Sequence, residues 1–255
     1  MITFHTEREI SENKFLVTGG AGFIGHHLVN YLMSHNAAHV KVFDNLSTGN
    51  IKNIEHHLSK PNFEFINADL INYEICLEAC KNIDFVFHQA AVGSVPRSIE
   101  DPLRTNLNNV NTQLNILWAA VQQKVKRVIY ASSSSVYGDN KNKEKQEKSI
   151  GLPLSPYAVS KRVNELYSMV FSNHYDIEII GLRYFNVFGP GQNSKGPYAA
   201  VIPLFIESLL KNTAPTIYGI GNQSRDFTYV ENVVQANIKA ALTSNKDAIG
   251  KILNI

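Results

Sequence analysis

The sequence predicts an α/β fold built on a doubly wound parallel sheet. Short, continuous apolar stretches, typical of buried strands, alternate with longer stretches that have helical periodicity. Strands that are apolar along their whole length indicate a parallel sheet covered by helices on both faces. Right-handed crossovers between such strands give the doubly wound arrangement. A chain of 255 residues suffices for one large domain of this class or for two small ones.

Strands and helices are expected in strict alternation up to residue 189. The expected strands, in chain order, are 14–18, 39–43, 63–67, 84–88, 126–131 and 177–183. The expected helices run from the glycine-rich turn after the first strand to about residue 33, and over about 73–81, 102–123 and 157–174. We therefore expect a main sheet domain over residues 1–189.

Beyond Gly189 the pattern changes, because prolines and glycines interrupt it repeatedly. We expect residues 190–255 to form a smaller, partial lobe at the carboxyl edge of the sheet. Residues 250–255 look like a strand, and a domain rarely ends on a strand that has no partner. The chain is therefore expected to be truncated within this lobe.

Composition excludes several classes of protein. Apolar residues make up 44% and charged residues 18%, which are ordinary values for a globular protein, and the net charge is only +2. The one charged run, 141–148, mixes lysine and glutamate and predicts a solvated loop, so no nucleic-acid partner is expected. No apolar run reaches membrane-spanning length and no signal peptide opens the chain, so we expect a cytoplasmic protein with no membrane partner.

The two cysteines, Cys76 and Cys80, are one helical turn apart. This spacing favours two reduced, buried thiols, with a metal pair as the remote alternative, and we expect no metal site.

A glycine motif, residues 19–25 (GGAGFIG), directly follows the first strand and opens a helix. In this context Gly19 allows the tight turn, Gly22 lets the backbone approach a pyrophosphate, and Gly25 lets helix and strand pack closely. The free N–H groups at the helix N-terminus favour phosphate oxygens. The motif predicts a Rossmann-type dinucleotide site; a purely structural turn is the alternative.

Two aspartates stand at the ends of neighbouring strands. The Asp44 carboxylate can accept hydrogen bonds from both adenosine ribose hydroxyls and repels a 2′-phosphate, which favours NAD over NADP. The alternative for Asp44 is a helix cap or turn cap together with Ser47. Asp69 could face the adenine edge or cap the following helix.

A tyrosine and a lysine share one helix face. Tyr157 and Lys161 are four residues apart, and Pro156 before them fits a helix start. An ammonium beside a phenol is expected to lower the tyrosine pKa, so that the phenol can exchange a proton with a substrate hydroxyl. The serine run 132–135 lies at the carboxyl end of the strand 126–131, where a hydroxyl can hold a substrate oxygen; a plain polar loop is the alternative.

In combination these motifs resemble the extended short-chain dehydrogenase/reductase family, in its NAD-dependent nucleotide-sugar epimerase/dehydratase branch. The segments 88–91 (HQAA), 183–189 (RYFNVFG) and 224–227 (SRDF) fall in the family's order along the whole chain. One departure is Thr112, where the family often has glycine. The resemblance implies NAD as cofactor, a nucleotide-sugar substrate and catalytic roles for Ser133, Tyr157 and Lys161.

The resemblance also implies binding residues. For NAD these are Gly19, Gly22, Phe23, Ile24, Gly25, Asp44, Asn45, Ser47, Gly49, Asp69, Leu70, Gln89, Ala90, Asn109, Tyr157, Lys161, Tyr184 and Val187. For the sugar nucleotide they are Gly93, Ser94, Ser133, Ser134, Tyr157, Asn186, Ala200, Val201, Tyr218 and Arg225. Arg225 is expected to pair with the diphosphate; a surface salt bridge is its alternative.

The residues after Ser133 indicate which reaction follows the shared first oxidation. Dehydratases of the family carry an Asp-Glu pair there and decarboxylases a glutamate, whereas this chain has Ser134 and Ser135, which are not acids at neutral pH. The resemblance thus implies 4-epimerisation through a 4-keto sugar. Segments 93–98 and 154–157 resemble bacterial epimerases of UDP-N-acetylglucosamine and UDP-N-acetylgalactosamine, or of their uronic acids.

Two alternatives to the epimerase stay open. The chain could be an inactive NAD-binding fragment, or another nucleotide-sugar oxidoreductase or dehydratase. The resemblance further implies a homodimer that pairs through the helices expected over 102–123 and 157–174.

Overall fold

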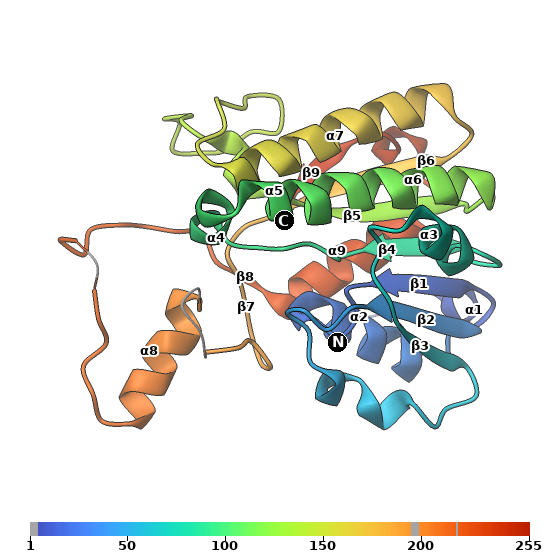
Figure 1. Cartoon of the computed structure of the whole chain (residues 1–255), viewed down its shortest axis with the longest axis horizontal. Helices are drawn as coiled ribbons and strands as arrows, with labels where there is room; N and C mark the ends of the chain where they lie inside the picture. Colours follow the sequence, from blue (N-terminus) through green and yellow to red (C-terminus); the bar gives the residue numbers. More distant parts are fainter. Residues whose placement is uncertain (1–4, 195–198, 218) are drawn as a thin grey trace.

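The computed structural model describes residues 5–194, 199–217 and 219–255. Within these residues one sheet has seven parallel strands in the order β3-β2-β1-β4-β5-β6-β9, which confirms the predicted doubly wound α/β fold (Figure 1). Its strands are β1 (Lys14–Thr18), β2 (His39–Asp44), β3 (Phe63–Asn67), β4 (Phe85–His88), β5 (Arg127–Ser133), β6 (Glu178–Tyr184) and β9 (Ile252–Asn254).

The strands are mostly apolar because both faces of the sheet are covered. Along β1, Phe15 and Val17 belong to one buried cluster and Leu16 belongs to the other. Helices α2 (Phe23–Ser34) and α9 (Val230–Leu242) contribute to the first cluster. Helices α3 (Tyr73–Ala79), α6 (Thr112–Gln122) and α7 (Pro156–His174) contribute to the second. The free thiols of Cys76 and Cys80 are buried in the second cluster, as their spacing predicts.

The long helix expected over 102–123 is present but is not regular. It consists of α5 (Pro102–Asn106), a π-helical turn (Leu107–Asn111) and α6. The π turn inserts extra backbone into the helix, and such insertions commonly re-aim side chains at functional sites. The remaining short helices before it are α1 (Glu7–Ser11) and α4 (Val95–Glu100).

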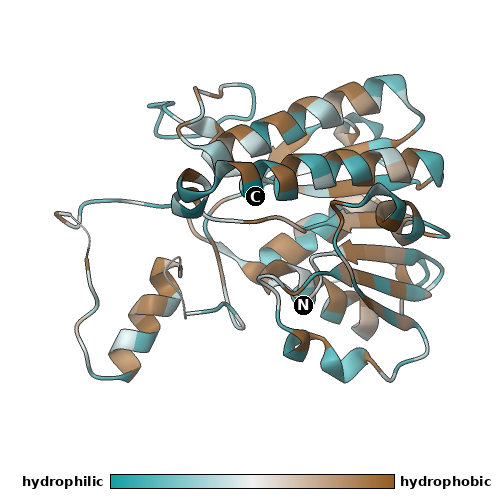
Figure 2. Ribbon diagram, viewed as in Figure 1, coloured by the Kyte–Doolittle hydropathy of each residue, from teal (hydrophilic) through white to brown (hydrophobic). Residues whose placement is uncertain are grey.

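Between β6 and α9 the chain leaves the sheet, in a segment of residues 185–229 that we call the excursion. It forms β7 (Val187–Phe188), then α8 (Val201–Leu210), then β8 (Thr228–Tyr229), which pairs with β7. In Figure 1, α8 stands away from the sheet, and none of its residues is buried. Figure 2 shows that most of its residues are hydrophobic.

The chain then returns to the sheet, which corrects two expectations about its last part. Helix α9 packs against α2, and β9 pairs with β6 through Leu182 and Leu253. The segment 250–255 therefore has a strand partner, whereas the sequence suggested that it has none. Residues beyond 190 are divided between the excursion and the main sheet, because α9 supplies apolar side chains that cover the sheet face left open beside α2.

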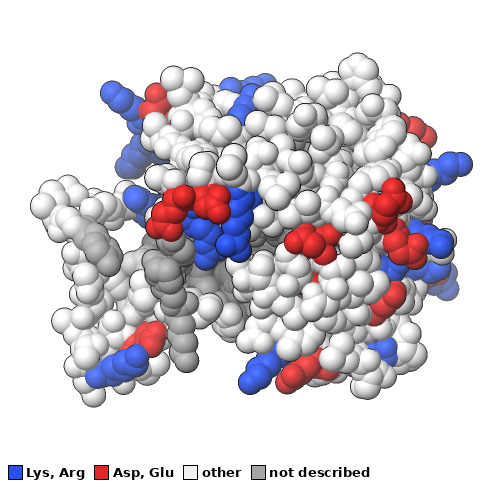
Figure 3. Space-filling view, in the orientation of Figure 1, with Lys and Arg blue, Asp and Glu red and all other residues white. Residues whose placement is uncertain are grey.

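The surface shows no concentration of one charge on the face seen in Figure 3, where acidic and basic side chains are interspersed. The charged run 141–148 forms a largely exposed loop, as predicted. None of the helices in the described segments combines the length and the apolar character that a membrane crossing requires.

Candidate functional site

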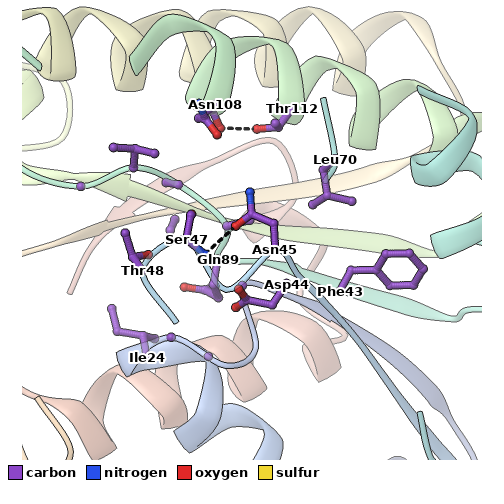
Figure 4. A pocket seen from close by; sticks show the side chains of 18 of the residues that line it. Ile24, Phe43, Asp44, Asn45, Ser47, Thr48, Leu70, Gln89, Asn108 and Thr112 are labelled. Atoms are coloured by element: carbon purple, nitrogen blue, oxygen red, sulfur yellow. Dashed lines mark hydrogen bonds between the residues drawn. The ribbon is translucent and has the colours of Figure 1, made fainter. Parts of the chain in front are cut away.

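A hollow of about 320 Å³ opens at the carboxyl ends of the central strands, in the size range of small-molecule sites. Figure 4 shows it between the glycine turn with Ile24 and the helix that carries Asn108 and Thr112. Its lining residues are Gly19, Gly22, Phe23, Ile24, Gly25, Phe43, Asp44, Asn45, Ser47, Thr48, Ala68, Asp69, Leu70, Gln89, Ala90, Ala91, Val92, Gly93, Asn108, Thr112, Ala131, Ser132, Tyr157 and Lys161.

The glycine turn presents backbone donors to this hollow. Gly22 is the N-cap of α2 and offers no side-chain cap, so the first N–H groups of the helix are free for a ligand. Gly19 has a φ of +67°, which favours glycine. A Cβ at Gly25 would collide with the carbonyl oxygen of Gly19, so only glycine allows this close helix–strand approach. The turn fits a pyrophosphate, which needs both donors and room.

Asp44 ends β2 at the floor of the hollow. Its Oδ2 accepts a hydrogen bond of 3.0 Å from the Ala21 N–H, and its Oδ1 accepts one of 2.8 Å from the Leu46 N–H. Burial raises the pKa of the Asp44 carboxyl, and the two backbone bonds oppose this rise. A Cβ at Gly49 would lie 3.0 Å from both carboxylate oxygens, so a larger residue there would crowd the carboxylate. Asp44 is thus both a turn cap and part of the hollow.

A second acid lies beside Asp44 on the neighbouring strand end. Asp69 Oδ1 accepts a bond of 3.0 Å from the Ile71 N–H, and Asp69 Oδ2 accepts one of 3.0 Å from the Asn45 side chain. The Asn45 Oδ1 accepts a bond of 3.0 Å from the Ser47 N–H, which is drawn in Figure 4. This chain of bonds orders the edge of the hollow where a nucleoside would lie. The helix cap that was the alternative for Asp69 is not formed, because the N-cap of α3 is Asn72.

The proposed acid–base group lies at the other end of the hollow. Tyr157 and Lys161 are on α7, which starts at Pro156 and is capped by Ser155, whose hydroxyl accepts a bond from the Ala158 N–H. The Lys161 ammonium lies 5.9 Å from the centre of the Tyr157 ring and donates a bond of 2.7 Å to the Ala131 carbonyl. Burial lowers the pKa of Lys161 to about 8, against the opposing charge of Glu165.

One expectation about Tyr157 is not met. The sequence predicted that Lys161 lowers the tyrosine pKa, but the pKa of Tyr157 is raised. The cause is burial, which removes water from the hydroxyl; a hydrogen bond with Ser133 lowers the pKa only in part. The phenol is therefore held neutral near pH 7 in the free chain.

Behind the hollow lies a polar network that the sequence did not reveal. The Tyr184 hydroxyl donates to Gln89 Oε1 at 3.1 Å, and the Asn237 amide of α9 donates to the Tyr184 hydroxyl at 2.8 Å. Gln89 Nε2 donates to Asn237 Oδ1 at 3.2 Å. Tyr184 therefore supports the lining residue Gln89, and neither Tyr184 nor the half-buried Val187 lines the hollow itself.

Asn109 has a different place from the one expected. It is buried, and its side chain accepts a bond of 2.7 Å from the Val92 N–H and donates to the Val92 carbonyl. It orders the loop after β4 and is not among the lining residues. The π turn instead directs Asn108 and Thr112 toward the hollow, where Thr112 donates to the Asn108 carbonyl at 2.5 Å.

Other lining residues were missed by the sequence interpretation. These are Phe43, Thr48, Ala68, Ala91, Val92, Asn108, Thr112, Ala131 and Ser132. Most of them are next in sequence to residues that were predicted, so the positions of the strand ends already indicate them. The positions of Asn108 and Thr112 at the hollow can be explained only by the π turn in the irregular helix.

The expected sugar-side residues are not gathered in the hollow, apart from Gly93 and Tyr157. Ser133 lies one residue beyond the lining residue Ser132, and Ser134 follows it. Ser94 caps α4 by accepting a bond of 3.3 Å from the Arg97 N–H. The others lie on the excursion: Asn186 donates to the Asp226 carbonyl, Ala200 and Val201 begin α8, and the exposed Arg225 donates to the Ser224 carbonyl. Tyr218 lies outside the described residues.

The hollow fits NAD. It combines a donor-rich glycine turn, a buried carboxylate at the end of β2 and a tyrosine–lysine pair at the opposite end. The Asp44 carboxylate fits ribose hydroxyls and disfavours a 2′-phosphate.

Comparisons with known proteins agree with this geometry. Residues 15–255 match the family described as the NAD dependent epimerase/dehydratase family. A putative UDP-glucose 4-epimerase of Methanocaldococcus jannaschii is 42% identical over 233 residues, which are 91% of this chain and 74% of that protein.

Two solved structures are similar over most of the chain. A UDP-N-acetylglucosamine 4-epimerase from Methanobrevibacter ruminantium, in complex with UDP-N-acetylmuramic acid, has a TM-score of 0.89 at 42% identity, covering 95% of this chain and 76% of that one. A UDP-glucuronic acid 4-epimerase from Bacillus cereus, in complex with UDP-glucuronic acid and NAD, has a TM-score of 0.85 at 35% identity, covering 95% of this chain and 77% of that one.

Proposed function

This chain belongs to the NAD-dependent epimerase/dehydratase family of nucleotide-sugar enzymes, and we propose that it catalyses the 4-epimerisation of a UDP-sugar. The observation that carries the proposal is the Tyr157–Lys161 pair at one end of the NAD hollow, with Ser133 bonded to Tyr157 and no carboxylate at Ser134 or Ser135. A dehydratase or a decarboxylase needs a further acid or base there, and neither serine is one at neutral pH.

Ser133, Tyr157 and Lys161 have separate roles in the proposed reaction. NAD, held by the glycine turn and Asp44, would supply the hydride acceptor for C4 of the sugar and, once reduced, the hydride donor. The Ser133 hydroxyl, which bonds with Tyr157, holds the sugar 4-oxygen beside the phenol. Tyr157 takes the proton from that oxygen and gives it back, and the fixed charge of Lys161 favours the phenolate while the proton is away. The 4-keto sugar then accepts hydride on its other face, which inverts C4.

The substrate pair that we propose first is UDP-N-acetylglucosamine and UDP-N-acetylgalactosamine, with their uronic acids next. A Cβ at the lining residue Gly93 would meet no atom within 4 Å, so this side of the hollow has room for a substituent. The similar solved structures are named for UDP-N-acetylglucosamine and UDP-glucuronic acid. Together with the similar putative UDP-glucose 4-epimerase, these names support a UDP-sugar, and the room at Gly93 favours one larger than UDP-glucose.

The test is conversion of the sugar nucleotide followed by proton NMR, which separates the anomeric signals of the two C4 epimers. We expect UDP-N-acetylglucosamine to equilibrate with its epimer while the absorbance of NADH at 340 nm shows no lasting rise. A lasting rise with release of a keto product would instead establish an oxidoreductase. Loss of water to a 4-keto-6-deoxy sugar would establish a dehydratase.

A second candidate is NAD binding without turnover, and one observation favours it. Ala200, Val201 and Arg225, which the family resemblance assigns to the sugar nucleotide, lie on the excursion and outside the hollow. Calorimetry with UDP-N-acetylglucosamine distinguishes the two candidates. Tight binding supports the epimerase, and NAD binding without any binding of UDP-sugars supports the second candidate.

We also propose that the chain forms a homodimer through α5, α6 and α7, as the family resemblance implies. Exposed apolar residues form a stripe on each helix, with Leu103 83% exposed on α5 and Val170 52% exposed on α7. The helices lie side by side in Figure 1. Trp118 and Leu166 continue the two stripes. Self-association of this surface would bury it, and a patch of this kind is typical of an interface.

A further inference from the structure

Three residues on successive turns of α7 reach three successive residues at the end of β5. Tyr157 bonds with Ser133, and the Lys161 ammonium donates to the Ala131 carbonyl. One turn further on, Glu165 Oε1 accepts a bond of 2.6 Å from the Ser132 hydroxyl. Because residues four apart share a helix face, the helix and the strand end are joined at three consecutive points.

Glu165 is the deepest of these points and is held by a buried arginine of β6. Glu165 is fully buried and Arg183 is 2% exposed. Arg183 Nε donates to Glu165 Oε1 at 2.8 Å, and Arg183 Nη2 donates to Oε2 at 3.0 Å. The two parallel bonds fix the plane of the carboxylate, which a single lysine contact would not do.

Arg183 is itself anchored on its far side. Its Nη1 donates to the Tyr137 hydroxyl and to the Glu147 carbonyl, both at 3.0 Å. The Tyr137 hydroxyl donates in turn to Asn254 Oδ1 of β9 at 2.7 Å. The guanidinium therefore cannot shift without disturbing the loop after β5 and the last strand of the sheet.

We propose that Glu165 and Arg183 are positioning residues for the proton transfer: Arg183 fixes the Glu165 carboxylate, and Glu165 fixes the Ser132–Ser133 end of β5 against Tyr157 and Lys161. Neither residue lines the hollow and both are buried, so neither is placed to touch cofactor or substrate. The inference rests on the proposed function only where the test measures turnover of a UDP-sugar. The part of the test that measures binding needs only NAD.

The Glu165 charge also acts on Lys161, whose pKa burial lowers to about 8 and Glu165 raises. The other groups around Lys161 keep one charge state near neutral pH. Burial lowers the pKa of His88 on β4 to about 3 and raises that of Tyr157, so both are neutral. Arg183, with a raised pKa, stays charged. Between pH 6 and pH 10, Lys161 is thus the group near the phenol that titrates.

The first variant is Glu165→Gln, which keeps the shape and removes the charge. We expect turnover of the UDP-sugar to fall at least tenfold at pH 7 while its KM changes little, because the reacting groups and not the binding surface lose their alignment. Because Lys161 lines the hollow, we expect NAD affinity to fall as this ammonium loses its proton. In Glu165→Gln this fall, measured by calorimetry from pH 6 to pH 9.5, should begin at lower pH than in the unmodified chain, because Lys161 loses its proton sooner.

The matched control is Glu178→Gln. The Arg127–Glu178 pair joins the same two strands, β5 and β6, at their opposite ends, with a bond of 2.9 Å from Arg127 Nε. Neither residue lines the hollow. The control should keep the turnover and the NAD titration of the unmodified chain. An equal loss in the control would show that any weakened β5–β6 pair lowers activity, and would overturn the proposal.

A double variant, Glu165→Leu with Arg183→Met, separates positioning from folding. It removes both members of the buried ion pair together, so neither is left without the other, although Arg162 and Lys161 lose the Glu165 charge. Apolar replacement of a buried ion pair is commonly tolerated. We expect it to fold and to bind NAD, yet to stay impaired in turnover, since Ser132 has lost its acceptor. Turnover restored to that of the unmodified chain would overturn the proposal, even if Glu165→Gln fails to fold.

A failure of the proposed function can be distinguished from a failure of this inference. If the unmodified chain converts no UDP-sugar, the NAD titration still decides the inference, because it depends on Glu165 and Lys161 and on no sugar. An unchanged titration in Glu165→Gln would overturn it.

Discussion

The Lys161 ammonium donates its bond of 2.7 Å to the Ala131 carbonyl from a position that is only 3% exposed. The folded chain holds this proton less tightly than the unfolded chain, since the pKa falls from 10.5 to about 8. The charge therefore destabilises the folded state fully below pH 8. The cost disappears as the pH rises from 8 to 10.5, where only the unfolded chain keeps the proton.

The first prediction follows from this destabilising effect of the Lys161 charge. Lys161→Met should raise the free energy of unfolding at pH 7 by on the order of 2–3 kcal/mol, which is the pKa shift less about one lost hydrogen bond. The gain should shrink between pH 8 and pH 10.5. Urea unfolding at pH 7 and pH 10 measures both values. The exposed Lys52→Met is the control, and equal effects of the two substitutions at pH 7 would refute the prediction.

The second prediction concerns cofactor choice. Asp44→Ala should weaken NAD binding by about 10- to 100-fold, because ribose hydroxyls and the Ala21 and Leu46 N–H groups lose their acceptor. The preference for NAD over NADP should narrow. Calorimetry with each dinucleotide measures the change. Asp139→Ala is the control, since this carboxylate accepts a bond from the Leu152 N–H outside the hollow. Equal affinity of the unmodified chain for both dinucleotides would contradict the assignment.

The third prediction concerns the acid–base group. Tyr157→Phe should lower turnover of the UDP-sugar about 10²- to 10⁴-fold, since it removes the proton acceptor and nothing else. NAD should stay bound, as measured by calorimetry. Tyr167→Phe removes a hydroxyl from the outer side of the same helix and should have little effect. Near-normal turnover by Tyr157→Phe would exclude Tyr157 as the base.

The fourth prediction concerns the glycine turn. Gly25→Ala should destabilise the chain by about 1–3 kcal/mol and abolish measurable NAD binding, because its Cβ meets the Gly19 carbonyl oxygen. Gly93→Ala is the control within the same hollow, since a Cβ there meets nothing within 4 Å. Thermal unfolding should show a loss for Gly25→Ala and none for Gly93→Ala. Equal melting temperatures would mean that the turn relaxes without cost.

The fifth prediction concerns the dimer. Val170→Glu on α7 should shift the chain toward monomer, because a carboxylate would be buried in the apolar contact between helices. Light scattering after size-exclusion chromatography measures the mass. Leu210→Glu on α8, where Leu210 is 80% exposed, should leave the mass unchanged. A chain that is monomeric before any substitution would contradict the proposed interface.

The fold and the cofactor end of the hollow were predictable from sequence because their signals are local. The glycine turn, Asp44 and the Tyr157–Lys161 spacing each lie within one strand–turn–helix segment. Asn237 was not predictable, since its partner Gln89 is 148 residues away. Nor was the raised pKa of Tyr157, because desolvation depends on which elements pack around the hydroxyl. The places of Asn108 and Thr112 at the hollow were not predictable either, because they depend on the π turn.

The place of β9 has a consequence for the order in which the molecule folds during synthesis. Strands β1 to β6 emerge first and can pair with one another, but β9 reaches β6 only after residues 185–251 have been made. Until then β6 is an open edge strand with unpaired backbone groups, a template for aggregation. Pulsed hydrogen exchange should find the amides of β9 among the last to gain protection, and a chaperone that binds extended peptide should act before β9 docks.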